Sequence, residues 1–162
     1  MRKLILILCC LSFFNCFFNQ ENTSVDPFFS SYDPVLLAIS EFENSIVLQD
    51  NQPITAASKI YIIDNFIFIN DKRTGFHIFD NSDPTNPIKK KFLKAPGATD
   101  IAIRNNVLYI NQATDLVVLT FDFNALTAVV NKRVKNVFPE LLSPDGEWFN
   151  EEGKVVVNWI EK

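Results

Sequence analysis

The chain has 162 residues, of which 48% are hydrophobic and 21% charged, a composition that indicates one globular domain and excludes a disordered chain. Its four glycines lie too far apart to build the loop that holds a nucleotide phosphate. There is one histidine, His77, and all three cysteines lie within the first sixteen residues, which excludes a metal site built from several His and Cys ligands. We therefore expect no cofactor, no metal and no enzymatic activity.

The N-terminus is typical of an exported protein. A basic start at residues 2–3 precedes an eleven-residue stretch, 4–14, that is apolar except for one serine and too short to span a bilayer. Cys16 at its polar boundary resembles the acceptor of a bacterial lipoprotein signal, although Asn15 stands where that signal has a small residue. We expect residues 1–16 to be a signal peptide with Cys16 as the lipid-bearing residue. A plain secretory signal and an uncleaved anchor are the alternatives.

Cysteine usage and charge agree with export. A chain cleaved before Cys16 keeps no second cysteine and forms no intramolecular disulfide. The net charge is −4, and it becomes −6 after loss of Arg2 and Lys3, because 13 basic and 19 acidic residues remain. An acidic domain disfavours nucleic acid as a partner. The one basic cluster, formed by residues 89–91 and Lys94, predicts an edge strand with solvated lysines.

The segment that follows the signal contains a tether and a short helix. Residues 17–32 are polar and aromatic and predict an extended tether. Residues 33–48 hold the helical candidate, because Ser40 and Glu43 have capping-box spacing. We expect one or two helical turns near residues 40–46.

From Lys59 onward the chain reads as antiparallel strands. Short runs of β-branched and aromatic residues alternate with turns rich in Asn, Asp, Gly and Pro. The expected strands are residues 60–63, 66–69, 75–80, 88–93, 100–103, 107–111, 116–119 and 127–137.

The second group of strands repeats the first. Asn105-Asn106 falls on Asp64-Asn65 at an offset of 41 residues, and the strand at 116–119 falls on 76–79 at an offset of 40. A period near 40 residues with four strands per unit is that of a β-propeller blade. We therefore expect an all-β domain over 33–162.

This domain is expected to contain propeller-like tandem four-stranded antiparallel blades. The repeats lie at about 59–96 and 100–137, and the apolar run 155–159 is expected to begin an incomplete third. Closed propellers start at about four blades, so an open module, a barrel completed by another copy and a shortened family member are all compatible with this length.

One segment resembles a known family. The run from Gly75 to Asp80, followed by Asp83-Pro84 and Pro87, resembles an LVIVD repeat, whereas the second copy has Thr120 in place of the aspartate. The C-terminal segment 136–146 is similar to that of LVIVD lipoproteins of Bacteroidetes-type bacteria. The resemblance implies propeller-like blades and an envelope location, with no catalytic residues to transfer. The repeat-motif residues to which it gives a structural role are Gly75, Phe76, Ile78, Asp80, Asp83, Pro84 and Pro87.

The remaining candidates for chemistry are few. Asp80 and Asp83 are expected to form Asx turns and not a Ca²⁺ site, because the spacing of an acidic calcium loop is missing. His77 is expected to be a packed or edge histidine and not a general base, since no second titratable group stands beside it by spacing. Trp148 and Trp159 are expected to cover the end of a sheet and not to stack on a sugar.

These observations predict a non-catalytic lipoprotein of the cell envelope, at the outer membrane. The lipid anchor attaches it to the membrane, and its β-repeat module binds or scaffolds an unidentified protein or polysaccharide, with self-association as one form. The alternative is an assembly subunit whose open blade edge is completed by a partner protein. A binding module should show a concave site with convergent polar groups, and an assembly subunit an open apolar face.

Overall fold

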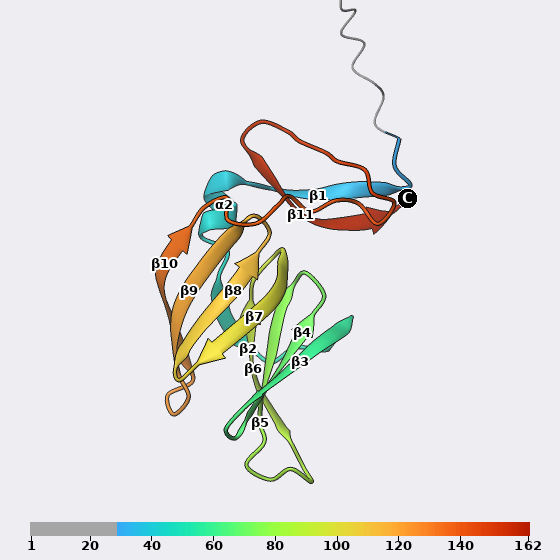
Figure 1. Cartoon of the computed structure of the whole chain (residues 1–162). Coiled ribbons are helices and arrows are strands. Elements are labelled where there is room, and N and C mark those ends of the chain that lie inside the picture. The colour runs from blue at the N-terminus through green and yellow to red at the C-terminus, as the bar shows by residue number, and fades with distance from the viewer. Residues whose placement is uncertain (1–28) are drawn as a thin grey trace, which may run out of the picture.

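The computed structural model describes residues 29–162 (Figure 1). The expected signal peptide 1–16, the lipidation site Cys16 and most of the expected tether lie outside the described residues. The elements are β1 (Tyr32–Ala38), α2 (Ile39–Glu43), β2 (Val47–Asp50), β3 (Ala57–Ile63), β4 (Phe66–Asp71), β5 (Gly75–Asp80), β6 (Ile88–Lys94), β7 (Ala98–Arg104), β8 (Val107–Gln112), β9 (Asp115–Asp122), β10 (Thr127–Val134) and β11 (Lys154–Glu161). They form three antiparallel sheets, none of which closes on itself.

The first sheet has the strand order β2-β6-β5-β4-β3. Strands β3 to β6 form the expected four-stranded meander, and β2 adds a fifth strand outside β6. The expectation of an edge strand is therefore wrong for Lys91 and Lys94, which pair with β2, whereas residues 89–90 lie beyond the end of β2. Lys91 Nζ is 2.8 Å from Asp50 Oδ1 of β2. Strand β2 has four residues and lies about 40 residues before β6, so the sequence contains no periodic pattern that predicts their pairing.

The second sheet repeats the meander, with the order β10-β9-β8-β7. Its turns also repeat. Asp64 and Asn105 have φ values of 47° and 54°, and Arg73 and Ala113 have values of 59° and 48°. The hydrogen bond from Asn81 N to the Asn65 carbonyl recurs between Phe121 and Asn106. The two segments therefore share strand order and the geometry of their first turn, whereas the second turn is one residue shorter in the second sheet.

The main core lies between these two sheets, which contribute opposite faces. From the first sheet it takes Phe68, Phe76 and Ile78, all with 0% exposure. From the second sheet it takes Leu108, Ile110, Val117 and Leu119, also with 0% exposure. By the repeat offset, Phe68 corresponds to Tyr109 and Ile78 to Val118, which pair with each other in the same register. Because successive side chains of a strand alternate between faces, the sheets stack front to back, as blades do.

The third sheet joins the two ends of the described chain. Strand β1 pairs with β11, so the 155–159 run, expected to begin a third unit, lies opposite an N-terminal strand. Residues 32–38 are therefore extended. The helix α2 is a single turn capped at Ala38 without a side-chain hydrogen bond, so the expected capping box of Ser40 and Glu43 is wrong. An apolar strand partner far along the chain outweighs the weak local helix signal.

The β1–β11 sheet lies across one end of the other two sheets (Figure 1). Val157 of β11 packs with Phe42 of α2 and with Ala113 in the β8–β9 turn. Ser30 Oγ donates a hydrogen bond of 2.8 Å to Asp145 Oδ1, and Ser31 N donates one of 2.8 Å to Oδ2. The expected tether therefore ends before Ser30, because these contacts hold the chain to the domain.

Candidate functional site

The repeat-motif residues build the first sheet. Phe76 and Ile78 lie in the core, and Gly75 has a φ of 152° with no room for a Cβ atom, which would lie 2.2 Å from the Leu93 carbonyl oxygen. Asp80 Oδ1 accepts a hydrogen bond from Ser82 N at 3.0 Å. These contacts are structural and do not converge on a cavity.

The loop from residue 81 to 87 carries the remaining motif residues, Asp83, Pro84 and Pro87. Asp83 Oδ1 accepts hydrogen bonds from Thr85 N at 3.0 Å and Thr85 Oγ1 at 2.7 Å. This is the geometry of an Asx turn, and the hydrogen bonds from Thr85 lower the pKa of Asp83. The two prolines have no N–H for a sheet ladder, so they suit the connection between β5 and β6.

His77 lies beside a titratable partner that the sequence did not reveal. Its Nε2 atom is 3.0 Å from Asp71 Oδ2, and the side chains are 0% and 2% exposed. The expectation that no titratable group stands beside His77 is therefore wrong. The signal was the hairpin itself: Asp71 pairs with Gly75, which places His77 two residues further along the neighbouring strand.

Asp71 also holds the loop that crosses from β2 to β3. It accepts hydrogen bonds from Thr55 N at 2.9 Å, Thr55 Oγ1 at 2.8 Å and Ala56 N at 2.6 Å. Burial alone would raise the pKa of Asp71, but the hydrogen bonds from His77, Thr55 and Ala56 outweigh it and lower the pKa to about 2. The pair is closed to solvent, and its Asp71 member positions the 51–56 loop.

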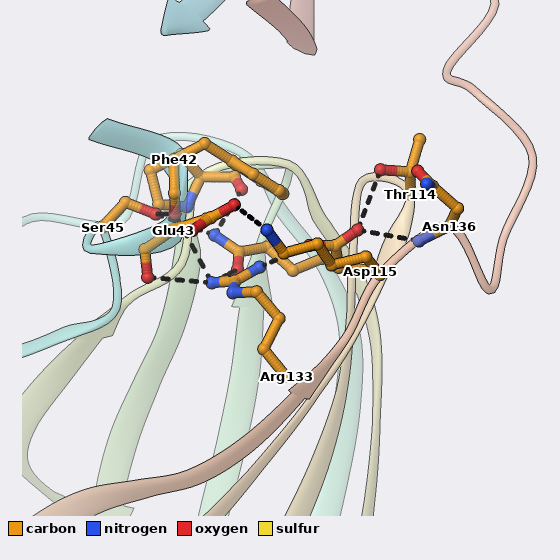
Figure 2. Close-up of polar contacts among 10 residues, drawn as sticks. Phe42, Glu43, Ser45, Thr114, Asp115, Arg133 and Asn136 are labelled. Atoms are coloured by element: carbon orange, nitrogen blue, oxygen red, sulfur yellow. Dashed lines mark hydrogen bonds and ion pairs between the residues drawn. The ribbon is translucent and has the colours of Figure 1, made fainter. Parts of the chain in front are cut away.

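A second buried polar cluster centres on Arg133 of β10 (Figure 2). Its Nη1 atom is 3.0 Å from Asp115 Oδ2, and its Nη2 atom donates a 2.8 Å hydrogen bond to Gln112 Oε1. The guanidinium also lies 4.8 Å from the centre of the Phe42 ring. Gln112 Nε2 extends the network by donating to Ser45 Oγ at 2.8 Å. This cluster ties the N-terminal segment to the second sheet, and its groups are engaged with one another.

The two tryptophans differ in environment. Trp159 is 6% exposed, and its Nε1 atom donates a 3.0 Å hydrogen bond to the Leu141 carbonyl. Trp148 is 57% exposed and bonds only at its edge, through Nε1, to Glu140. The expectation of a hydrophobic cover is therefore wrong for Trp148, because the segment before β11 forms an irregular loop and not a strand.

The outward face of the second sheet is open. Tyr109 of β8 and Val129 of β10 are 37% and 62% exposed, and Leu116 and Val118 of β9 are only partly buried. In the first sheet the equivalents of Tyr109, Leu116 and Val118 form the buried core face. The outward face of the first sheet also exposes Ile60 and Ile62 of β3, by 62% and 68%.

A groove of about 740 Å³ lies between the β1–β11 sheet and the β2–β6 side of the first sheet. Its apolar lining comes from Val35, Leu37, Val47, Phe92, Pro96 and Val157. Its charged and polar lining comes from Glu41, Asn44, Ser45, Gln49, Gln52, Arg73, Thr74, Lys94 and Asn158. This volume is within the range of small-molecule sites.

The described chain has neither a cluster of metal-ligand side chains nor a membrane-spanning helix. Between residues 29 and 162, no three His, Cys, Asp or Glu side chains gather as a metal site would require. In the same range no helix is both long and apolar enough to cross a membrane.

Comparison with known proteins identifies one repeat. No curated protein and no solved structure matches the chain. Residues 55–92 match the model of the LVIVD repeat, and this range runs from the end of the crossing loop through β3, β4 and β5 into β6. The first sheet of this all-β chain is therefore built around an LVIVD repeat, a propeller-type β-repeat.

Proposed function

We propose that this chain is a non-catalytic lipoprotein of the cell envelope, held at the outer membrane through Cys16, whose β-repeat module scaffolds a protein partner. The partner completes the open face of the second sheet. This partner includes a second copy of the same chain, which would make the protein self-associate. The all-β repeat architecture supports a binding or assembly role.

The main support for this role is that equivalent faces of the two sheets differ: the face is buried in the first sheet and exposed in the second. Phe68 and Ile78 are fully buried against the second sheet, whereas Tyr109 and Val118 occupy the same register positions and face outward. A propeller-type sheet has two apolar faces because neighbours stack on both. Exposed apolar faces of this kind mark protein interaction sites.

The closed state of the titratable pair supports a non-catalytic role. His77 and Asp71 form a buried acid–base pair, and the Asp71 carboxylate is committed to His77 and to the 51–56 loop. A general base has to reach the proton that it removes, directly or through one water molecule. Neither side chain lines the groove.

A photo-reactive amino acid at position 109 tests the scaffold role in the native host. We expect position 109 of the full chain to form a defined covalent adduct with a protein. Position 160 on β11 is the matched control, since Ile160 is 59% exposed but lies on another sheet. No adduct, or the same adducts from both positions, contradicts the proposal.

The anchor has its own test. Cys16→Ala should release the protein into a soluble fraction or leave it uncleaved, because lipid attachment requires the thiol. Mass spectrometry of the wild-type chain should find fatty acid on Cys16. A wild-type chain without fatty acid, together with a variant that partitions as before, contradicts the lipoprotein assignment.

A further inference from the structure

The groove beside the β1–β11 sheet holds two cations that lack a carboxylate partner. Arg73 lies in the β4–β5 turn and Lys94 at the end of β6, and the pairing of Gly75 with Lys94 brings these two positions together. Neither cation has an ion-pair partner among residues 29–162, whereas Lys90 and Lys91 on the same strand do. Glu41 is the one acidic residue among those that line the groove. This part of an acidic chain is therefore locally basic.

The turn itself does not require an arginine at position 73. Arg73 has a φ of 59°, which is a left-handed backbone conformation. The arginine side chain does not stabilise this conformation. The corresponding turn of the second sheet, which is one residue shorter, adopts a φ of 48° at Ala113. Both turns make the same type of hydrogen bond, from Ala95 N to the Thr74 carbonyl and from Val137 N to the Thr114 carbonyl. The β4–β5 turn is held by main-chain hydrogen bonds of Asp71, Arg73 and Thr74, and the guanidinium takes part in none of them.

The surroundings of the guanidinium favour an anionic ligand. The group is partly buried, and this burial lowers the pKa of Arg73. Its one close polar neighbour is Asn158 Oδ1, at 3.5 Å from Nη1, which is the outer limit of a hydrogen bond. A carboxylate is the natural partner of such a group, because it accepts two parallel hydrogen bonds from a guanidinium.

The rest of the groove presents neutral groups that both donate and accept hydrogen bonds. Gln49 on β2 and Gln52 in the crossing loop have side-chain amides with no hydrogen bond to residues 29–162, and Asn44 uses its amide only as a donor to the Ser40 carbonyl. Amides pair with hydroxyl groups, which are also both donors and acceptors. We propose that this groove binds an acidic sugar, with its carboxylate between Arg73 and Lys94 and its hydroxyls on the neighbouring amides. This site is separate from the open face of the second sheet.

Calorimetric titration of the full chain in a neutral detergent with digalacturonic acid tests the inference. We expect saturable binding that weakens about tenfold or more in Arg73→Ala and in Lys94→Ala, since each removes a charge-assisted contact. Arg73→Ala should fold normally, because the guanidinium makes one polar contact with residues 29–162, at 3.5 Å, and the turn bonds are made by the main chain. The matched controls are Arg104→Ala and Lys132→Ala, which remove cations outside the groove and should leave the affinity unchanged.

Other probes decide between the alternatives. The dimethyl ester of the same disaccharide should bind at least about tenfold more weakly, because it lacks the charge. Equal binding of acid and ester, an equal loss in the control variants, or no binding at millimolar concentration overturns the inference. Inorganic phosphate that binds as tightly as the sugar reduces the site to an anion site and also overturns it. An acidic tripeptide that binds more tightly assigns the groove to a protein segment instead.

Discussion

At the scale of single residues, the described chain depends on a few buried polar groups in fixed partnerships. Asp71, His77 and Gly75 lie at one end of the β4–β5 hairpin, where the crossing loop meets the sheet. The aspartate is 1% exposed and the histidine 0%. Buried groups of this kind stabilise a fold only while their partners are present.

Asp71→Asn should change how stability depends on pH. The lowered pKa of about 2 means that the folded state binds its proton more weakly than the unfolded state does, for which the ordinary value is 3.8. The carboxylate therefore stabilises the fold above pH 4, by about 2 kcal/mol, and this contribution is lost as the pH falls towards 2. Urea unfolding of both proteins between pH 2 and 7, a range set by these pKa values, should show free energies of unfolding that diverge as the pH rises. Parallel profiles contradict this role.

Gly75→Ala should be strongly destabilising. A Cβ atom at this position would lie 2.2 Å from the Leu93 carbonyl oxygen, so the β5–β6 pair would have to move apart. We expect a loss of roughly 2–4 kcal/mol, since overpacking adds to backbone strain. Gly153→Ala is the matched control, because its φ is 77° but nothing lies within 4 Å, so it should lose only about 1 kcal/mol. Equal losses in urea melts would show that the backbone conformation alone is responsible.

At the scale of elements, short segments are held by the sheets that they contact. The helix α2 has five residues, too few for independent stability. It forms where Phe42 packs with Ala113 of the β8–β9 turn and Val157 of β11. Strand β2 exists because β6 supplies its ladder partner. The Arg133 cluster supports this region, because its Nη2 atom also lies 3.4 Å and 3.3 Å from the carbonyl oxygens of Phe42 and Glu43.

Arg133→Ala should destabilise the protein by about 3–5 kcal/mol. The side chains of Arg133 and Asp115 are 10% and 5% exposed, so the substitution leaves a buried carboxylate without its positively charged partner. Lys135→Ala removes a pair with Glu43 whose side chains are 59% and 33% exposed, and should cost less than about 1 kcal/mol. Thermal unfolding of both variants checks this difference. Similar losses would mean that the Arg133 pair behaves as a surface pair.

At the scale of the whole molecule, the β1–β11 sheet joins the two ends of the described chain and lies across one end of the two stacked sheets (Figure 1). Its buried members, Val157 and Trp159, pack against residues from α2 and from the loop before β11. The stacked sheets have a separate core between them. We therefore expect the terminal sheet, which also forms one wall of the groove, to unfold as a second cooperative unit.

A chain that ends after Gly153 should keep the two stacked sheets and lose the terminal one. Strand β1 has β11 as its one ladder partner in the described chain, so its amides should lose their protection from hydrogen exchange. Amides of β4, β5, β8 and β9 should stay protected because their partners remain. Exchange measured by mass spectrometry on both chains checks this. Loss of protection throughout would show that the three sheets unfold as one unit.

The local pattern of the sequence determined much of the fold. Runs of β-branched and aromatic residues placed the strands β3 to β10, and the repeated turns at Asp64 and Asn105 fixed the 41-residue period. The reason is physical: alternating apolar side chains and turn residues act within a few positions of each other. The LVIVD match at residues 55–92 rests on the same local pattern.

Tertiary structure decided the rest. The pairing of β1 with β11, the place of β2 outside β6, the contact of His77 with Asp71 and the groove beside Arg73 join residues from separate segments. Each depends on which strands become neighbours after the sheets stack. No local periodicity in the sequence predicts the pairing of strands that are far apart along the chain. For the same reason, the repeat period predicted blade-like sheets, but only the packing determined that Phe68 is buried and that its repeat equivalent Tyr109 is exposed.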